Sequence, residues 1–444
     1  MSPAEGFSGA QCSEARIRGT RLTDEAAGTA ALSGQSAALK DFAHSRESDD
    51  ASLPDPRLHR IPRGPVFGTG VLGQAKSARW PRVDEQGDCL YTTNGRAAIL
   101  LGLDALGVGR GDQVLLPTYH CPTMVDAVVR LGAEPIFYPI KPSGDADVDD
   151  LRRLNMTRVK ALLVAHFFGL PQDLGPARQF CDDLGLALIE DCAHAFFGRS
   201  ALGAFGSVGD MAIGSLTKFF PLIEGGCLVM RKPASRLPVL GRAGLANQLR
   251  TVWDAFELGA TAGRLGPAAV LMSTLVRLKH RIRARGPIEQ VADLAEPDLS
   301  TVFDTIDLAK VKRRPAAFVT WLVRHADSER IVNTRRANYL QFARLLSGQA
   351  RMRPLFAHLP EGAAPYVFPL DVDDPDEIYR ALRRRGVPMY RWDILWPGTP
   401  VLPGDATARW SRHVLQLACH QDMTEADVGA VADAIRDECE LRPT

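Results

Sequence analysis

The feature that most constrains the fold is an alternation of short apolar runs with amphipathic stretches between about residues 82 and 232. Apolar runs end at Pro117, Ala165 and Asp191, and segments with helical spacing of apolar residues separate them. Buried strands that alternate with helices are typical of βαβ units and a parallel sheet. We therefore predict an α/β fold whose large domain has a mostly parallel sheet with helices on both faces.

The remaining sequence indicates how the chain divides. Residues 1–62 are rich in small and charged residues and poor in aromatics, which predicts a flexible N-terminal extension. Residues 63–310 are predicted to form the large domain, with a helical insert at about 238–297, and residues 311–444 a smaller C-terminal α/β domain. The insert carries the basic run RLGPAAVLMSTLVRLKHRIRARG, which is either a packed helix with a solvated charged face or a basic surface for a membrane or an anionic partner.

Charge and cysteine usage exclude several function classes. The 444 residues include 53 basic and 52 acidic side chains, so the chain has no general attraction for nucleic acid, and none is expected as a partner. No apolar segment approaches about 18 residues, so no membrane span is expected. The eight cysteines form no CxxC pair and no spacing typical of a metal site. They predict reduced thiols in a cytoplasmic protein, without a metal.

Polar residues gather where the predicted strands end. In parallel sheets, ligands bind at the carboxyl ends of the strands. The candidates at these ends are Tyr119, His120, His166, Asp191, His194, Ser215 and Lys218.

Lys218 lies between an apolar strand and a Gly-Gly turn, in the loop GSLTKFFPLIEGG. Desolvation by Phe219, Phe220 and their neighbours favours the neutral amine and makes it a better nucleophile, which suits Schiff-base chemistry. On this loop alone, a lysine that extends past the aromatic rings to solvent is the slightly better interpretation.

The run LALIEDCAHA predicts a buried strand that ends in Glu190-Asp191. A pyridine cofactor needs a carboxylate against its ring nitrogen, and an acid at a strand end is well placed to provide it. Because side chains alternate along a strand, only one of the two acids can point into the site. Asp191 could also simply cap the next turn.

The segment TTNGRAAILLGL reads as a turn that leads into a helix. The backbone N–H groups of Gly95, Arg96 and Ala97, together with the helix dipole, suit a phosphate group. Arg96 would add charge and Ser215 a hydroxyl donor. The fingerprint GxxxxGK[ST] is not found, which argues against an ATP site. The run GTGVLG at residues 68–73 has the GxGxxG spacing, but it lies outside the predicted alternation of strands and helices and so does not indicate a dinucleotide site.

The phosphate turn, the YHC strand end, EDCAHA and SLTK followed by EGG resemble, in this order, fold-type I pyridoxal-phosphate enzymes. The resemblance is strongest to the DegT/StrS family of sugar aminotransferases, over about residues 91–232 and from about 336 to the end. It implies a fold-type I transferase, pyridoxal 5′-phosphate as cofactor, and a homodimer with sites at the subunit interface. It also implies an amino-acid donor, glutamate in line with the family, and a keto sugar, nucleotide-linked, in polysaccharide or secondary-metabolite biosynthesis.

The resemblance assigns roles to individual residues. Lys218 would form the Schiff base and later move the proton between the two carbons of the transferred amine. Asp191 would pair with the pyridine nitrogen, and His194 would lie near the ring hydroxyl. The phosphate would be held by Gly95, Arg96 and Ser215.

The sequence also departs from the family. The family usually stacks an aromatic on the cofactor where this chain has Cys121, so Tyr119 and His120 become the candidates for stacking. His166 matches a family strand end and is interpreted as structural. The usual Gly-x-Asn segment after the lysine is not recognisable, and the insert occupies that region.

Two other functions stay open from the sequence. One is a pyridoxal-phosphate dehydratase or aminodehydratase acting on a sugar or cyclitol; Lys218 argues against the version of this chemistry that uses histidine. The other is a cofactor-binding regulator without turnover, against which Lys218, Asp191 and Ser215 argue.

Overall fold

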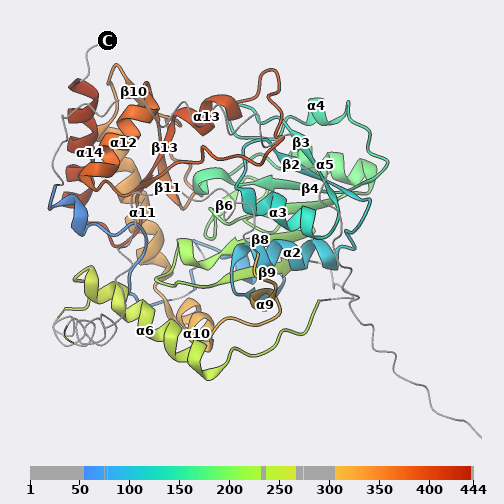
Figure 1. The fold of residues 1–444 in the computed structure, drawn as a ribbon, viewed down its shortest axis with the longest axis horizontal. Helices are drawn as coiled ribbons and strands as arrows, with labels where there is room; N and C mark the ends of the chain where they lie inside the picture. Colours follow the sequence, from blue (N-terminus) through green and yellow to red (C-terminus); the bar gives the residue numbers. More distant parts are fainter. Residues whose placement is uncertain are drawn as a thin grey trace, which may run out of the picture. The chain divides into compact units, whose positions relative to one another are not determined.

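The computed structural model describes residues 55–74, 76–77, 79–231, 237–266, 274 and 306–441 (Figure 1). Two larger β-sheets organise this part of the chain, and β6 (Arg199–Ser200) and β7 (Gly203–Ala204) form a third sheet of two short strands. The larger sheet has seven strands in the order β1-β9-β8-β5-β4-β2-β3. The strands are β1 (Asp88–Thr92), β2 (Gln113–Pro117), β3 (Glu134–Tyr138), β4 (Val159–Ala165), β5 (Ala187–Asp191), β8 (Met211–Ser215) and β9 (Gly226–Met230).

The parallel strands of the large sheet are those that the apolar runs predict. The strands β3, β2, β4, β5 and β8 pair in parallel, while β9 runs antiparallel to both β8 and β1. Leu115, Leu162 and Leu188 in the central strands are fully buried. Near-continuous apolar runs are typical of strands covered on both faces. The predicted mostly parallel sheet is therefore confirmed.

Helices cover both faces of this sheet. Helix α3 (Pro122–Arg130) connects β2 to β3, and α5 (Gly175–Leu184) connects β4 to β5. These two connections cross the sheet in opposite directions. Because such crossovers are right-handed, α3 and α5 lie on opposite faces. Helix α2 (Gly95–Ala105) packs beside α3 and covers β8 and β9.

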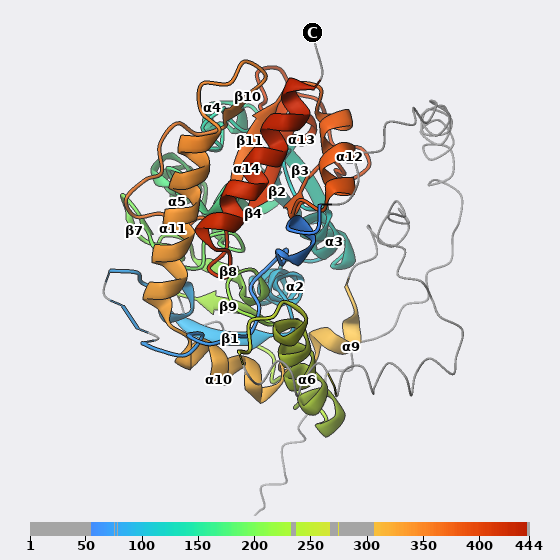
Figure 2. The ribbon, with the colours of Figure 1, turned by 90° about the vertical axis from the view of Figure 1, so that its left-hand side faces the viewer.

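The smaller sheet is built from the last quarter of the chain. It is antiparallel, in the order β10-β11-β13-β12, and Figure 2 shows α14 and α12 in front of it. Its strands and helices are β10 (Met352–Pro354), β11 (Val367–Val372), β12 (Met389–Tyr390), β13 (Val414–Ala418), α11 (Ser328–Leu345), α12 (Pro375–Arg385), α13 (Thr407–His413) and α14 (Glu425–Glu440). The predicted capping box at the start of α14 is present: the Thr424 side chain accepts from the Asp427 N–H, and the Asp427 side chain accepts from the Thr424 N–H.

Residues before position 62 already pack into the folded core. Leu58 and Ile61 lie within the range predicted as an extension, yet both are buried in the core of the smaller sheet. Ordered packing therefore begins within that range. Both sheets belong to one compact unit, and the domain limits at 63, 310 and 311 stay a prediction.

The predicted insert is only partly described. Helix α6 (Leu245–Thr261) lies within it, and α9 (Leu308–Val311) and α10 (Ala317–His325) follow it. Most of the basic run predicted to be a helix lies outside the described residues. None of the described helices combines the length and the apolar character that crossing a membrane requires.

Candidate active site

A cavity of about 230 Å³ lies where the parallel strands end at their carboxyl side, and we call it the strand-end cavity. Its walls come from the start of α2, the start of α3, and the ends of β4, β5 and β8. The predicted site residues that line it are Gly95, Arg96, Cys121, Asp191, His194, Ser215 and Lys218.

Tyr119 and Ala97 are not part of this lining. The Tyr119 ring is fully buried against Trp392 and Trp410, and its hydroxyl accepts a hydrogen bond from Gln416 at 3.3 Å. The structure thus places Tyr119 in the packing between the two sheets. The Ala97 N–H donates at 2.9 Å to the side chain of Asn94, which is the N-cap of α2.

His120, the other candidate for stacking, does not reach the cavity either. Its Nδ1 donates to the carbonyl oxygens of Pro117 and Thr118, and its Nε2 accepts from the Trp396 N–H. Burial lowers the pKa of His120 to about 4, so the ring is neutral. It holds the loop that carries Trp396 against the end of β2.

Lys218 ends the short 3-10 helix η4 (Leu216–Lys218) that follows β8. Its side chain is half-buried, and burial lowers the pKa of the amine. Nζ lies 5.1 Å from the centre of the Tyr366 ring, while Cys121 and Asp191 exert a weaker opposing effect on the pKa. The site thus favours an amine in its nucleophilic, neutral form, as the flanking aromatics predict.

The two acids at the end of β5 face different surroundings. Asp191 lines the cavity, is 3% exposed, and accepts from the Ala193 N–H at 2.8 Å. Burial raises the pKa of this carboxyl, so a cationic partner would stabilise its charge. Glu190 instead accepts from the N–H groups of Gly206, Val208 and Gly209. The alternation of side chains therefore selects Asp191 as the acid of the site.

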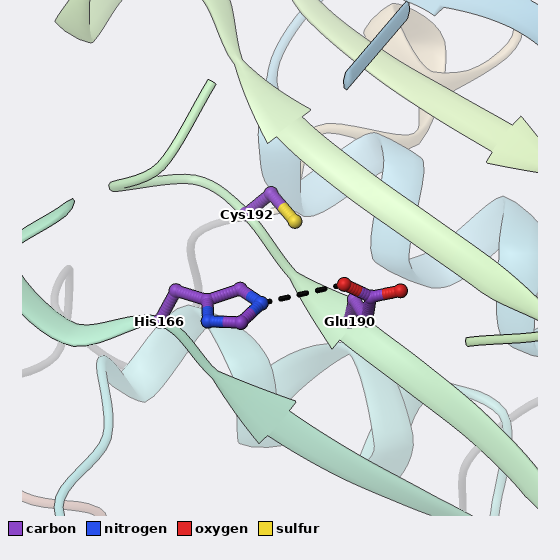
Figure 3. Close-up of side chains that lie close together, drawn as sticks. All are labelled: His166, Glu190 and Cys192. Carbon is purple, nitrogen blue, oxygen red and sulfur yellow. Dashed lines mark hydrogen bonds and ion pairs between the residues drawn. The ribbon is translucent and has the colours of Figure 1, made fainter. Parts of the chain in front are cut away.

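Glu190 also belongs to a buried cluster with His166 and Cys192, whose ligand atoms lie within 4.8 Å of one another (Figure 3). His166 Nδ1 accepts from the Gln172 N–H, so Nε2 carries the proton and donates to Glu190 at 3.3 Å. Burial keeps the pKa of the Cys192 thiol well above its ordinary value. A metal needs a thiolate and a free imidazole nitrogen. These three groups are therefore better suited to a structural hydrogen-bonded cluster than to a metal site.

His194 provides an unusual buried donor. Its Nδ1 accepts from the Phe168 N–H at 3.2 Å, so the proton lies on Nε2, a buried atom without a partner among the described residues. Burial holds the pKa of His194 well below its ordinary value. The backbone of Phe168 adopts a left-handed conformation, with φ of 60°. Its carbonyl oxygen accepts a hydrogen bond from the Tyr366 N–H at 2.8 Å.

The predicted phosphate turn is supported from below by the Gly-Gly turn that follows Lys218. A Cβ atom on Gly226 would lie 2.4 Å from the Asn94 carbonyl carbon, and the Gly225 N–H donates to the Thr93 carbonyl at 2.6 Å. Asn94 caps α2, whose first turn points Gly95 and Arg96 at the cavity. The EGG signature thus has a structural reason: only glycine lets β9 approach the turn this closely.

Sequence reasoning did not identify Trp392. Its ring lines the cavity and lies 4.9 Å from the His194 ring. Trp392 follows β12 in the smaller sheet and reaches the site only through tertiary packing. The run YRWDILW contains no periodic or glycine signal that could have predicted this.

The lining fits a phosphorylated pyridine. The helix start of α2 suits the phosphate, the buried Asp191 carboxylate suits a ring N–H, and the partnerless His194 Nε2–H suits a ring oxygen. The desolvated Lys218 amine suits a carbonyl carbon. Each of these four groups thus has a counterpart on pyridoxal phosphate.

A family model described as the DegT/DnrJ/EryC1/StrS aminotransferase family matches residues 83–364. GDP-perosamine synthase of Vibrio cholerae is 37% identical over 120 residues, which cover 26% of this chain and 33% of that protein. The erythromycin biosynthesis sensory transduction protein EryC1 of Saccharopolyspora erythraea is 32% identical over 224 residues, which cover 48% of this chain and 58% of that protein. These two matches thus span between a third and three fifths of the relatives' lengths.

Solved structures agree with the fold. The crystal structure of DesV from S. venezuelae, in complex with a ketimine intermediate, has a TM-score of 0.56 at 19% identity and covers 93% of this chain and 95% of that chain. PseC from Helicobacter pylori, an aminotransferase involved in the biosynthesis of pseudoaminic acid, has a TM-score of 0.56 at 15% identity and covers 81% and 90%. The predicted fold-type I architecture is confirmed by these matches.

Proposed function

Because the chain belongs to the DegT/DnrJ/EryC1/StrS aminotransferase family, we propose that it uses pyridoxal 5′-phosphate to move an amino group from an amino acid to a keto sugar. The observation that carries this proposal is the strand-end cavity, which joins a desolvated lysine, a buried carboxylate and a helix start in one lining. Glutamate is the proposed donor and a nucleotide-linked sugar the proposed acceptor.

The proposed cofactor would supply an electron sink next to the carbon that loses its proton. Lys218 would hold it through Nζ, and the same atom would take a proton from the donor's α-carbon and return one to the neighbouring carbon. A neutral amine is needed to take the proton, and burial of Lys218 favours that form. The ammonium that results would be the acid that returns the proton. The carbonyl oxygen of Lys218 accepts from Arg335 at 2.7 Å, which fixes the backbone under this amine.

The other residues of the cavity would bind and orient. The Asp191 carboxylate would accept the ring N–H, and its hydrogen bond from Ala193 sets the direction of the carboxylate. His194 would donate Nε2–H to a ring oxygen, with its other nitrogen already held by Phe168. Gly95, Arg96 and Ser215 would contact the phosphate. Trp392 and the half-buried Cys121 would shield the site from water.

We further propose a homodimer in the cytoplasm, in polysaccharide or secondary-metabolite biosynthesis. The names of relatives support the pathway class, since GDP-perosamine synthase and dTDP-3-amino-3,4,6-trideoxy-alpha-D-glucose transaminase are among them. The cysteines within the described part of the chain are free, which agrees with a reducing compartment.

A spectroscopic experiment tests the proposal. The protein is loaded with pyridoxal 5′-phosphate, and its visible spectrum is recorded before and after addition of glutamate. We expect a visible band that decays while 2-oxoglutarate forms. The Lys218→Ala variant should lack the band, whereas Lys160→Ala, at an exposed lysine of β4, should keep it.

The same experiment separates the alternatives. Cys121 occupies the position where the family usually stacks an aromatic ring, and this favours a cofactor-binding regulator as the second candidate. A band that persists with glutamate and with other amino acids would support the regulator. Absence of any band from the loaded wild-type protein would contradict the cofactor itself.

A further inference from the structure

A second cavity of about 230 Å³ meets the strand-end cavity at Thr217 and Lys218, the two residues common to both linings. We call it the arginine cavity. Its other walls come from the N-terminal segment and the smaller sheet, through Arg63, Arg335, Tyr366, Tyr390 and His420. It is therefore a space next to the reactive amine to which the strand ends of the larger sheet contribute little.

The arginine cavity is lined by cations without an acid. Arg63 and Arg335 both line it, and the lining contains neither aspartate nor glutamate. His420 adds no charge, because burial lowers its pKa to about 4. A cavity with this lining has a positive electrostatic potential. The low dielectric constant of the protein interior makes that potential stronger than it would be in water.

Arg335 is the most unusual of these cations. Its side chain is fully buried, and it donates only to neutral oxygens: Gln421 Oε1, and the carbonyl oxygens of Pro365, Tyr366 and Lys218. These bonds use four of the five guanidinium N–H groups. No carboxylate within the described ranges forms an ion pair with it. Burial accordingly lowers the pKa of Arg335 to about 10. A buried charge with neutral partners alone is costly, and an anion in the cavity would offset that cost.

The backbone around Arg63 is fixed by hydrogen bonds to side chains of the smaller sheet and of the loop that follows β13. His420 Nε2 donates to the Pro62 carbonyl at 2.8 Å, Tyr390 Oη donates to the Arg63 carbonyl at 3.0 Å, and the Val66 N–H donates to Asp422 at 3.0 Å. The Arg63 side chain itself is exposed, and no acidic partner for it is found in the described part of the chain. The segment is thus fixed at the cavity while its guanidinium stays available.

We propose that the arginine cavity binds a carboxylate of the amino donor, with Arg63 as its direct ligand and Arg335 as the buried positive charge behind it. This proposal rests on the proposed function and deepens it. The cavity is smaller than the about 300–1,000 Å³ of pockets that enclose drug-sized ligands. Its size therefore suits an amino acid better than a nucleotide sugar. A phosphate group of the acceptor shares the same anionic chemistry, and the test distinguishes the two.

The test compares Arg63→Gln with Arg60→Gln, an exposed arginine three residues earlier that does not line the arginine cavity. Glutarate, an unreactive dicarboxylate, and uridine diphosphate are titrated into cofactor-loaded protein by calorimetry. We expect Arg63→Gln to weaken glutarate binding roughly tenfold, the effect of one lost charge-assisted hydrogen bond. Uridine diphosphate binding should be unchanged, and Arg60→Gln should match the wild type for both probes.

Kinetics of the donor half-reaction provide a second measurement. In Arg63→Gln, the glutamate concentration at half-maximal rate should rise roughly tenfold, with little change in the maximal rate. Equal glutarate affinity in wild type and Arg63→Gln would overturn the proposal, as would weakened binding of uridine diphosphate in place of glutarate. Failure of the proposed function would look different: the visible band would resist every amino acid, while the glutarate titration would still report on Arg63.

Discussion

The two cavities that meet at Lys218 have similar volumes but opposite construction. The strand-end cavity is lined mainly by strand ends and helix starts between Asn94 and Lys218, and it contains the Asp191 carboxylate. The arginine cavity draws its walls from segments between Arg63 and His420, and its lining has cations but no acid. The difference indicates that the chemistry at the lysine is determined by one βαβ array. Recognition of the molecule that reacts there depends on how distant segments pack against that array.

The largest expected effect is a loss of transamination rate in Asp191→Asn. It tests whether the chemistry depends on the strand-end cavity. An amide cannot stabilise a charged ring N–H, so the transamination rate should fall roughly 10²–10³-fold. The free energy of unfolding should barely change, because burial already disfavours the charge on Asp191. The rate is measured by steady-state kinetics and the stability by urea unfolding.

Glu190→Gln is the matched control for this prediction. The Glu190 carboxylate accepts from Gly206, Val208 and His166 rather than facing the cavity. Its replacement should cost about 1–3 kcal/mol of stability and leave most of the activity. If both variants lose activity equally at equal stability, the separation of the two acids is wrong.

A second prediction concerns the floor of the strand-end cavity. In Gly226→Ala the new Cβ would clash with the Asn94 carbonyl carbon, so the phosphate turn must shift. Overpacking of this kind costs about 1–3 kcal/mol, and the same loss in binding free energy would be a roughly five- to 150-fold loss of cofactor affinity. Affinity is measured by titration of the apoprotein with pyridoxal 5′-phosphate.

Gly429→Ala serves as its control. Gly429 lies within α14, and a Cβ there would meet no atom within 4 Å. This variant should keep the cofactor affinity and gain about 0.5–1 kcal/mol of stability. Unchanged cofactor affinity in Gly226→Ala would mean that the turn does not hold the phosphate.

The smallest expected effect is on the pH dependence of the free energy of unfolding, and it compares one buried histidine from each cavity. Burial lowers the pKa of His194 well below its ordinary value and that of His420 to about 4. In the unfolded chain both rings bind a proton near pH 6.5. The unfolded state therefore binds more protons below that pH, and stability falls as the pH falls toward the folded pKa values.

Each histidine should contribute about 1 kcal/mol of stability loss between pH 6.5 and 5.5. Urea unfolding of the apoprotein at these two pH values measures the loss. His194→Gln and His420→Gln should each reduce it by a similar amount. A reduction in only one cavity variant would show that the other ring is protonated in the folded state.

The sequence predicted the part of the site that depends on local structure. Asn94, Asp191 and Lys218 each stand at a strand end or helix start, where the period of the apolar pattern determines the direction of the side chain. The prediction that Tyr119 contacts the cofactor is not supported by the lining. Beyond the end of β2 the strand period no longer applies, and the ring turns to Trp410 instead.

Other parts of the fold had no local signal. The antiparallel course of β9 and its pairing with β1 depend on register between segments far apart in the chain. Trp392 and Arg335 reach Lys218 from the smaller sheet and from α11, and neither lies in a pattern that indicates burial beside a lysine. Tertiary packing decides these positions, and a single sequence contains little information about it.

Phe168 has a consequence for communication across the site. A left-handed backbone conformation costs a bulky residue about 1–3 kcal/mol. In Phe168 this conformation directs the N–H group and the carbonyl group toward residues that line different cavities. The amide of Phe168 orients His194, and its carbonyl fixes the backbone of Tyr366. Relaxation of this single residue would release both rings at once. A substitution that relaxes Phe168 would therefore disturb both cavities together, through His194 in the first and Tyr366 in the second.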